Sequence, residues 1–139
     1  MIVLDTSIVL ALKDAGDERH GTVADWYRRL SEDLATTPLV LAEVDLAVRA
    51  RLGAAEARSF RRDVASGALT VEWWERAAAE SCAVAERYAD LALSLADASL
   101  VALAARLGTI AVATLDHRHF RAVRPLTGEA AFRLLPADA

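Results

Sequence analysis

Two short apolar runs, each ending at an aspartate, are the strongest constraint on how this chain folds. Met1 to Leu4 ends at Asp5, and Ile110 to Leu115 ends at Asp116. Short unbroken apolar runs are typical of strands buried on both faces, as in a parallel sheet. The carboxyl ends of parallel strands meet at one edge of a sheet, where α/β proteins place their sites. We therefore expect Asp5 and Asp116 to lie at the same edge.

The rest of the chain alternates between helical and extended patterns. Apolar residues at helical spacing, with capping residues at their ends, predict a helix from Ile8 through Leu12, capped by Asp5-Thr6-Ser7, and helices at 19–33, 38–52, 54–65, 74–88 and 94–107. Further short strands are predicted at 34–37, 69–73 and 132–135. Strands that alternate with helices indicate an α/β layered domain with a mostly parallel sheet.

Size and composition favour one domain spanning residues 1–139. The chain is 55% hydrophobic and 26% charged, which excludes a disordered or fibrous protein. No apolar run approaches the roughly 20 residues needed to cross a bilayer, and the N-terminus lacks a signal-peptide pattern. The single cysteine, Cys82, excludes an intramolecular disulfide, and its Ala-rich surroundings predict a small core residue. Together these features predict a cytoplasmic protein.

The net charge of −4 is a weak argument against a nucleic-acid partner, because phosphate binding usually needs a positive surface. Net charge averages over the whole surface, however, and basic patches can coexist with an acidic site. Two basic groups are candidates for phosphate contact, with solvated surface charge as the alternative for each. They are His117, Arg118, His119, Arg121 and Arg124, and then Arg49, Arg51, Arg58, Arg61 and Arg62.

Two aromatic pairs also have two interpretations each. Trp73 and Trp74 could stack on bases, but neighbours in a strand face opposite ways, so one of them is expected in the core. Trp26 and Tyr27 are expected to pack in the core, with a docking surface for a partner helix as the alternative.

Four acids do not fit the pattern of solvated surface charge. Asp5 and Asp116 end apolar runs, Asp97 lies inside an apolar helical stretch, and Glu43 lies early in the helix predicted from Pro38. A carboxylate buried without compensation is costly, so a group of four needs a cation. Oxygen ligands at this density suit Mg²⁺ or Mn²⁺, whereas Zn²⁺ would favour His or Cys.

Each acid also has a purely structural interpretation. Asp5 and Asp116 could cap the helices that follow them, Asp97 could bond a neighbouring loop, and Glu43 could pair with Arg49. All four together, two of them at strand ends, favour the metal site. Carboxylates that hold two metal ions about 4 Å apart suit phosphodiester hydrolysis, leaving a 5′-phosphate and a 3′-hydroxyl.

The same residues carry a resemblance to the PIN-domain family, and specifically to VapC-type toxins of VapBC toxin–antitoxin modules. The resemblance rests on four segments in order along the chain: Ile2-Val3-Leu4-Asp5-Thr6-Ser7, Pro38-Leu39-Val40-Leu41-Ala42-Glu43-Val44, Leu95-Ala96-Asp97-Ala98-Ser99-Leu100-Val101 and Thr114-Leu115-Asp116-His117-Arg118-His119-Phe120.

This resemblance implies a three-layer α/β/α sandwich and an endoribonuclease toxin that cleaves RNA. It implies Mg²⁺ or Mn²⁺ ligation by Asp5, Glu43, Asp97 and Asp116, with the hydroxyls of Thr6 and Ser7 in support. It also implies a homodimer and inhibition by a cognate VapB-type antitoxin. Some members of the family carry another acid shortly before the third one. Position 94 is Ser here and Asp90 lies a turn further back, so a role for Asp90 at a second ion stays open.

Other functions fit the residues less well. A haloacid-dehalogenase-like phosphatase needs a second Asp two residues after the first, but position 7 is Ser. A receiver domain needs a lysine after a late strand, but the only lysine is Lys13. A non-catalytic binding module would not need all four acids. A DNA nuclease with the same site is the nearest alternative, because the metal chemistry barely separates DNA from RNA.

Overall fold

The computed structural model describes all 139 residues around a central five-stranded sheet. The strands are β1 (Ile2–Leu4), β2 (Leu34–Thr36), β3 (Thr70–Val71), β4 (Ala111–Ala113) and β5 (Arg133–Leu135). Their order in the sheet is β3-β2-β1-β4-β5, and every neighbouring pair is parallel. The sheet is therefore parallel throughout, where the sequence predicted a mostly parallel one.

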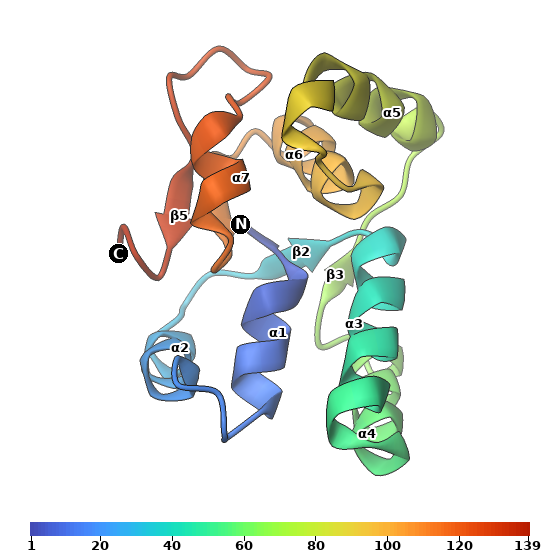
Figure 1. Cartoon of the computed structure of the whole chain (residues 1–139), viewed down its shortest axis with the longest axis vertical. Helices are drawn as coiled ribbons and strands as arrows, with labels where there is room; N and C mark the ends of the chain where they lie inside the picture. The colour runs from blue at the N-terminus through green and yellow to red at the C-terminus, as the bar shows by residue number, and fades with distance from the viewer.

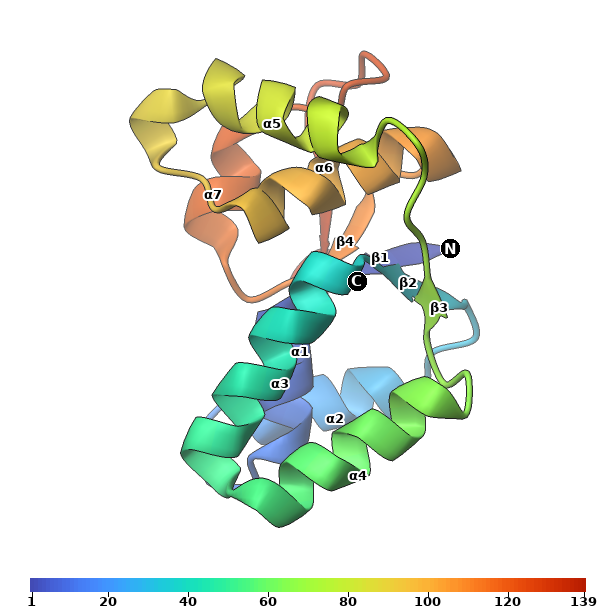
Figure 2. The same cartoon turned by 90° about the vertical axis from the view of Figure 1, so that its right-hand side faces the viewer.

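Helices cover both faces of this sheet (Figure 1). They are α1 (Thr6–Lys13), α2 (His20–Arg28), α3 (Pro38–Leu52), α4 (Ala54–Ala65), α5 (Ala77–Arg87), α6 (Leu95–Leu107) and α7 (His117–Ala122), with a 3-10 turn η1 (Ala89–Leu91). Figure 2 shows α5 and α6 on one side of the sheet and α1, α2 and α4 on the other. The predicted three-layer α/β/α sandwich is confirmed.

The buried core joins the sheet to α6. Residues 96–104 of this helix are all buried, as expected for a helix that is apolar almost all round. Leu100 and Leu103 are fully buried, and each such side chain stabilises the fold by about 1.5–3 kcal/mol relative to exposure. The first turn of α6 is thereby fixed against the carboxyl edge of the sheet. No helix is both long enough and apolar enough to cross a membrane.

Capping residues set the ends of the two helices that carry acids. The Thr37 side chain accepts from the Val40 backbone N–H at the start of α3, where Pro38 occupies the first turn. The Ser94 hydroxyl accepts from the Asp97 backbone N–H at 3.0 Å at the start of α6. Gly108 ends α6 in the left-handed conformation, with a φ of 65°.

The ends of several predicted elements were wrong. The helix predicted at 19–33 stops at Arg28, and the strand predicted at 69–73 is a two-residue exposed edge strand. The strand predicted at 110–115 keeps only Ala111–Ala113. The helix predicted from Trp74 begins at Ala77, because the Ala77 N–H bonds to the Trp74 carbonyl in a turn.

Cys82 is exposed, so its assignment to the core was also wrong. The buried face of α5 consists of Ala77, Ser81 and Val84, at helical spacing. Cys82 lies one residue past Ser81 and therefore faces solvent. Composition alone did not show which face of this Ala-rich helix packs against the core.

Candidate metal centre

Two of the four predicted acids follow neighbouring strands. Asp5 directly follows β1 and Asp116 lies three residues after β4, and in the sheet Leu4 is paired with Ala113. The Asp5 backbone N–H donates to the Ala113 carbonyl at 3.0 Å, which extends the ladder by one step. Both acids therefore lie at the carboxyl edge of the sheet, as the apolar runs predicted.

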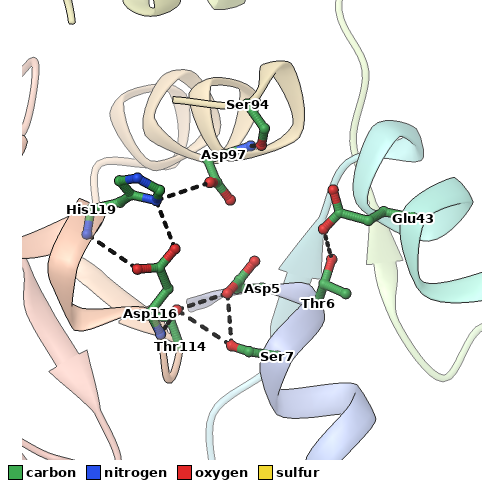
Figure 3. A network of polar contacts seen from close by, with 9 residues as sticks. All are labelled: Asp5, Thr6, Ser7, Glu43, Ser94, Asp97, Thr114, Asp116 and His119. Atoms are coloured by element: carbon green, nitrogen blue, oxygen red, sulfur yellow. Dashed lines mark hydrogen bonds and ion pairs between the residues drawn. The ribbon is translucent and has the colours of Figure 1, made fainter. Parts of the chain in front are cut away.

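Two helices bring the other acids to the same edge. Glu43 lies in the second turn of α3, which begins directly after β2, and Asp97 lies in the first turn of α6. Figure 3 shows the four carboxylates converging from these separate segments. They line one pocket of about 240 Å³, whose full lining is Asp5, Thr6, Ser7, Leu10, Glu43, Ser94, Asp97 and Asp116.

Hydroxyl groups hold Asp5 in place. Ser7 Oγ and Thr114 Oγ1 donate to the same oxygen, Asp5 Oδ2, at 2.8 and 2.7 Å. Ser7 Oγ also accepts from the Leu115 backbone N–H at 2.9 Å, which ties α1 to the end of β4. Burial raises the pKa of Asp5, whose residue is only 4% exposed, although the two hydroxyls oppose that rise. The Asp5 side chain makes no capping hydrogen bond to α1, so the alternative that Asp5 only caps this helix was wrong.

Glu43 differs from Asp5 in being exposed to solvent. Its Oε1 accepts from Thr6 Oγ1 at 2.5 Å, so the hydroxyl next to Asp5 also orients the acid from α3. Glu43 forms no ion pair with Arg49, which was its structural interpretation. Thr6 thus links two carboxylates of the pocket.

Asp97 is, with Asp5, one of two acids in the pocket whose pKa is raised. Burial is the main cause that raises the pKa of Asp97 to about 6, and the nearby charges of Asp5 and Asp116 add to the rise. The residue is 9% exposed. Like charges confined at this edge of the sheet repel one another, so the metal-free protein holds Asp97 at a cost.

Asp116 lies at the outer side of the cluster, and its carboxylate contacts His119. Asp116 caps α7, because its Oδ1 accepts from the His119 backbone N–H at 3.2 Å. Its Oδ2 lies 2.8 Å from His119 Nδ1, and the same ring nitrogen lies 3.8 Å from Asp97 Oδ2. The Thr114 hydroxyl accepts from the Asp116 backbone N–H at 2.9 Å. Asp116 therefore caps α7, as its structural interpretation predicted, and also belongs to the acidic cluster.

The donor set fits a hard divalent cation. No lysine or arginine lies within 4 Å of a side-chain oxygen of Asp5, Glu43, Asp97 or Asp116, so no cationic side chain compensates the two that are buried. Carboxylate oxygens are the ligands that Mg²⁺ and Mn²⁺ prefer. Asp97, Asp116 and His119 also place one ligand atom each within 4.8 Å of one another.

Asp90 and the aromatic candidates are not part of this pocket. Asp90 is exposed on η1 and does not line the pocket. Trp26 is buried while its neighbour Tyr27 is 48% exposed, so only one of that pair packs in the core. Trp74 packs against the core and beneath Arg106, whereas Trp73 is 43% exposed. Trp74 is half-buried against the core, but neither tryptophan lies in a strand, so the strand alternation behind the expectation was wrong.

The basic candidates divide into paired and unpaired side chains. Arg61 makes two hydrogen bonds to Asp45 at 2.7 and 2.9 Å, and Arg121 makes two to Asp138 at 2.8 and 2.6 Å. Both guanidinium groups are thereby partly neutralised. Among these candidates, the exposed side chains without an ion pair are Arg49, Arg51, Arg58, Arg62, His117, Arg118 and Arg124.

Comparison with known proteins decides the family. The family model described as PIN domain matches residues 2–125. The chain belongs to the PIN domain family. A curated relative, Ribonuclease VapC26 of Mycobacterium tuberculosis (strain ATCC 25618 / H37Rv), is 35% identical over 128 residues, which cover 91% of this chain and 95% of the relative. This relative supports the resemblance to VapC-type PIN domains that the four motifs indicated.

Two solved structures share the PIN fold with this chain. One is Mycobacterium tuberculosis VapC20, described as a sarcin–ricin loop cleaving toxin, with a TM-score of 0.78 and 24% identity over 84% of this chain and 91% of that one. The other is FitAcB from Neisseria gonorrhoeae, with a TM-score of 0.58 and 25% identity over 84% of this chain and 88% of that one. At these identities the comparison supports the fold and leaves the target open.

Proposed function

We propose that this PIN domain is an endoribonuclease toxin that binds Mg²⁺ or Mn²⁺ through Asp5, Glu43, Asp97 and Asp116 and hydrolyses RNA phosphodiesters. The observation that carries the proposal is the convergence of four carboxylates in one pocket with no lysine or arginine beside them. The match to a named ribonuclease over nearly the whole chain supports RNA as the substrate class.

Bound divalent ions would supply an activated water and charge stabilisation for the leaving 3′ oxygen. The side chains of the protein hold the site in shape for that chemistry. Ser7 and Thr114 fix Asp5, and Thr6 fixes Glu43. Ser7 donates to Asp5 and accepts from Leu115, so its hydroxyl is committed to structure and is not a free nucleophile. We expect products with a 5′-phosphate and a 3′-hydroxyl.

The same proposal includes two protein partners and a location. We propose a homodimer inhibited by a cognate VapB-type antitoxin, acting in the cytoplasm on cellular RNA. The unpaired arginines on α3 and α4 and beside Asp116 supply positive charge for the RNA backbone, despite the net charge of −4.

The test is to incubate the purified protein with total cellular RNA, with and without Mg²⁺ or Mn²⁺, and to map the new 5′ ends. An Asp5→Asn/Asp97→Asn variant keeps the shape of the site and removes the charge. Discrete, metal-dependent cuts with 5′-phosphates that this variant does not make would support the proposal. Cutting that survives both EDTA and the substitutions would overturn it. Cutting of DNA and not RNA would favour the DNA nuclease.

A further inference from the structure

One residue, His119, contacts both carboxylate oxygens of Asp116. The His119 backbone N–H reaches Oδ1 at 3.2 Å and His119 Nδ1 reaches Oδ2 at 2.8 Å. An ionised carboxylate only accepts hydrogen bonds, so Nδ1 is the donor in this contact. The two contacts together hold the carboxylate at both ends (Figure 3).

The same ring nitrogen also faces the acid from the other helix. His119 Nδ1 lies 3.8 Å from Asp97 Oδ2, and no other basic side chain comes within 4 Å of any of the four acids. Asp97 lies in the first turn of α6 and His119 lies on α7, so the imidazole on one helix faces the acid on the other. His119 is thus the one donor placed between two carboxylates that repel each other.

We propose that His119 is a positioning residue of the metal centre, which keeps the Asp116 carboxylate turned toward Asp97 and thereby raises the affinity for the divalent ion. The inference rests on the proposed function and adds a residue outside its ligand set. The Asp116 side chain is 34% exposed and sits at the start of a six-residue helix, so little other packing fixes its rotamer. Loss of such supporting hydrogen bonds typically costs about 10–100-fold in metal affinity.

Geometry favours positioning over direct ligation. Nδ1 is the ring nitrogen that faces the two carboxylates, and because it donates its hydrogen to Asp116 it has no lone pair for a metal. Asn is the substitution that separates these roles, because its side-chain N–H₂ can take the place of the Nδ1–H donor. Ala removes the donor, and both variants keep the backbone cap on Asp116.

The test is Mn²⁺ binding by titration calorimetry without RNA, for the wild type, His119→Ala, His119→Asn and the control His117→Ala, which changes an exposed histidine on the same helix. We expect His119→Ala to bind Mn²⁺ about 10–100-fold more weakly and His119→Asn to recover to within about threefold. The control should bind as the wild type does. With RNA, His119→Ala at subsaturating Mn²⁺ should lower kcat, and added Mn²⁺ should restore it.

Three results would overturn the inference. His119→Ala that is folded and binds Mn²⁺ like the wild type removes the positioning role. An Asn variant as weak as the Ala variant shows that the donor is not what matters. Nitrogen coupling from His119 in the electron spin-echo spectrum of bound Mn²⁺ shows direct ligation instead. A wild type that cuts RNA but binds no Mn²⁺ at this edge refutes the metal centre itself, which is a separate failure.

Discussion

Two regions of the molecule shift the pKa of an aspartate in opposite directions. One is the pocket at the carboxyl edge of the sheet, and the other is the corner between α7 and the C-terminal segment. In the pocket, Asp97 is buried without a lysine or arginine, and its pKa is raised to about 6. At the corner, hydrogen bonds from Arg121 and from the Leu134 backbone N–H lower the pKa of Asp138 to about 2. Asp138 is paired with Arg121, whereas Asp97 has no lysine or arginine partner.

The difference teaches that count and identity of acids are poor guides to a site. This chain has 20 Asp and Glu residues, and most of them are exposed. What distinguishes the four candidates is convergence from four segments and the lack of an arginine partner. These carboxylates lie close together at the carboxyl edge of the sheet, where the ends of strands and the starts of helices meet.

The largest effect expected is on nuclease activity. Asp5→Asn or Asp97→Asn should each lower RNA cleavage by about 1,000-fold or more, since losing metal-borne charge stabilisation costs several kcal/mol. Single-turnover cleavage of a mapped target measures this. Asp25→Asn is the matched control, because Asp25 is exposed and pairs with Arg28 on α2, so its rate should stay within about twofold. An equal loss of cleavage rate in Asp25→Asn would contradict a special role for the acids of the pocket.

The next effect is on thermal stability with metal. Mn²⁺ at about 100 times its Kd should stabilise the wild type by about 3 kcal/mol, or about 5–10 °C in Tm. Asp97→Asn should lose most of that shift, while Asp25→Asn should keep it. Differential scanning fluorimetry with and without EDTA is the measurement. A Tm shift that Asp97→Asn retains in full would place the ion elsewhere.

Without metal, the same substitution should stabilise the protein. The folded pKa of Asp97 lies above the usual 3.8, so its charge opposes folding: the cost is absent below about pH 4 and complete above about pH 6. At pH 7, Asp97→Asn should gain about 2 kcal/mol in the free energy of unfolding, with little gain at pH 4. Urea unfolding at the two pH values in EDTA checks this. A variant that is less stable at pH 7 would contradict the account of a strained metal-free pocket.

The smallest effect expected is at the corner. Asp138 has a lowered folded pKa, so the stability it contributes is present above about pH 4 and lost as the pH falls through about 2. Asp138→Asn should change Tm at pH 7 by no more than about 3 °C, because exposed ion pairs contribute little. Asp138→Asn should lower the stability at pH 7, whereas Asp97→Asn should raise it in EDTA. A stabilising effect of both variants would mean that the two regions do not differ.

The sequence predicted the layout of the site because its signals are local. Apolar runs that stop at Asp5 and Asp116 specify buried strands and their ends, and a parallel arrangement then places both at one edge. The hydroxyls predicted to support the first acid also bond to acids, Ser7 to Asp5 and Thr6 to Glu43. Ligation by the four acids themselves stays a prediction.

What the sequence did not show depends on tertiary geometry. Thr114 and His119 were not singled out as partners of the acids, although a hydroxyl two residues before Asp116 and a histidine three residues after it were visible signals. Which oxygen each one reaches depends on how β4 and α7 pack against α6. Burial differs as well, since Asp5 and Asp97 are buried but Glu43 is exposed, and helix α3 presents it at the mouth of the pocket.

The central claim is that the four acids form a cation site. A crystal of the protein soaked in Mn²⁺ and measured at the manganese absorption edge tests it most directly. The account predicts an anomalous peak in the pocket, with oxygens of Asp5 and Asp97 about 2.0–2.3 Å from the ion, and no such peak in Asp5→Asn/Asp97→Asn. A peak bound away from these carboxylates, or an empty pocket in crystals of a protein that cleaves RNA with Mn²⁺, would contradict it.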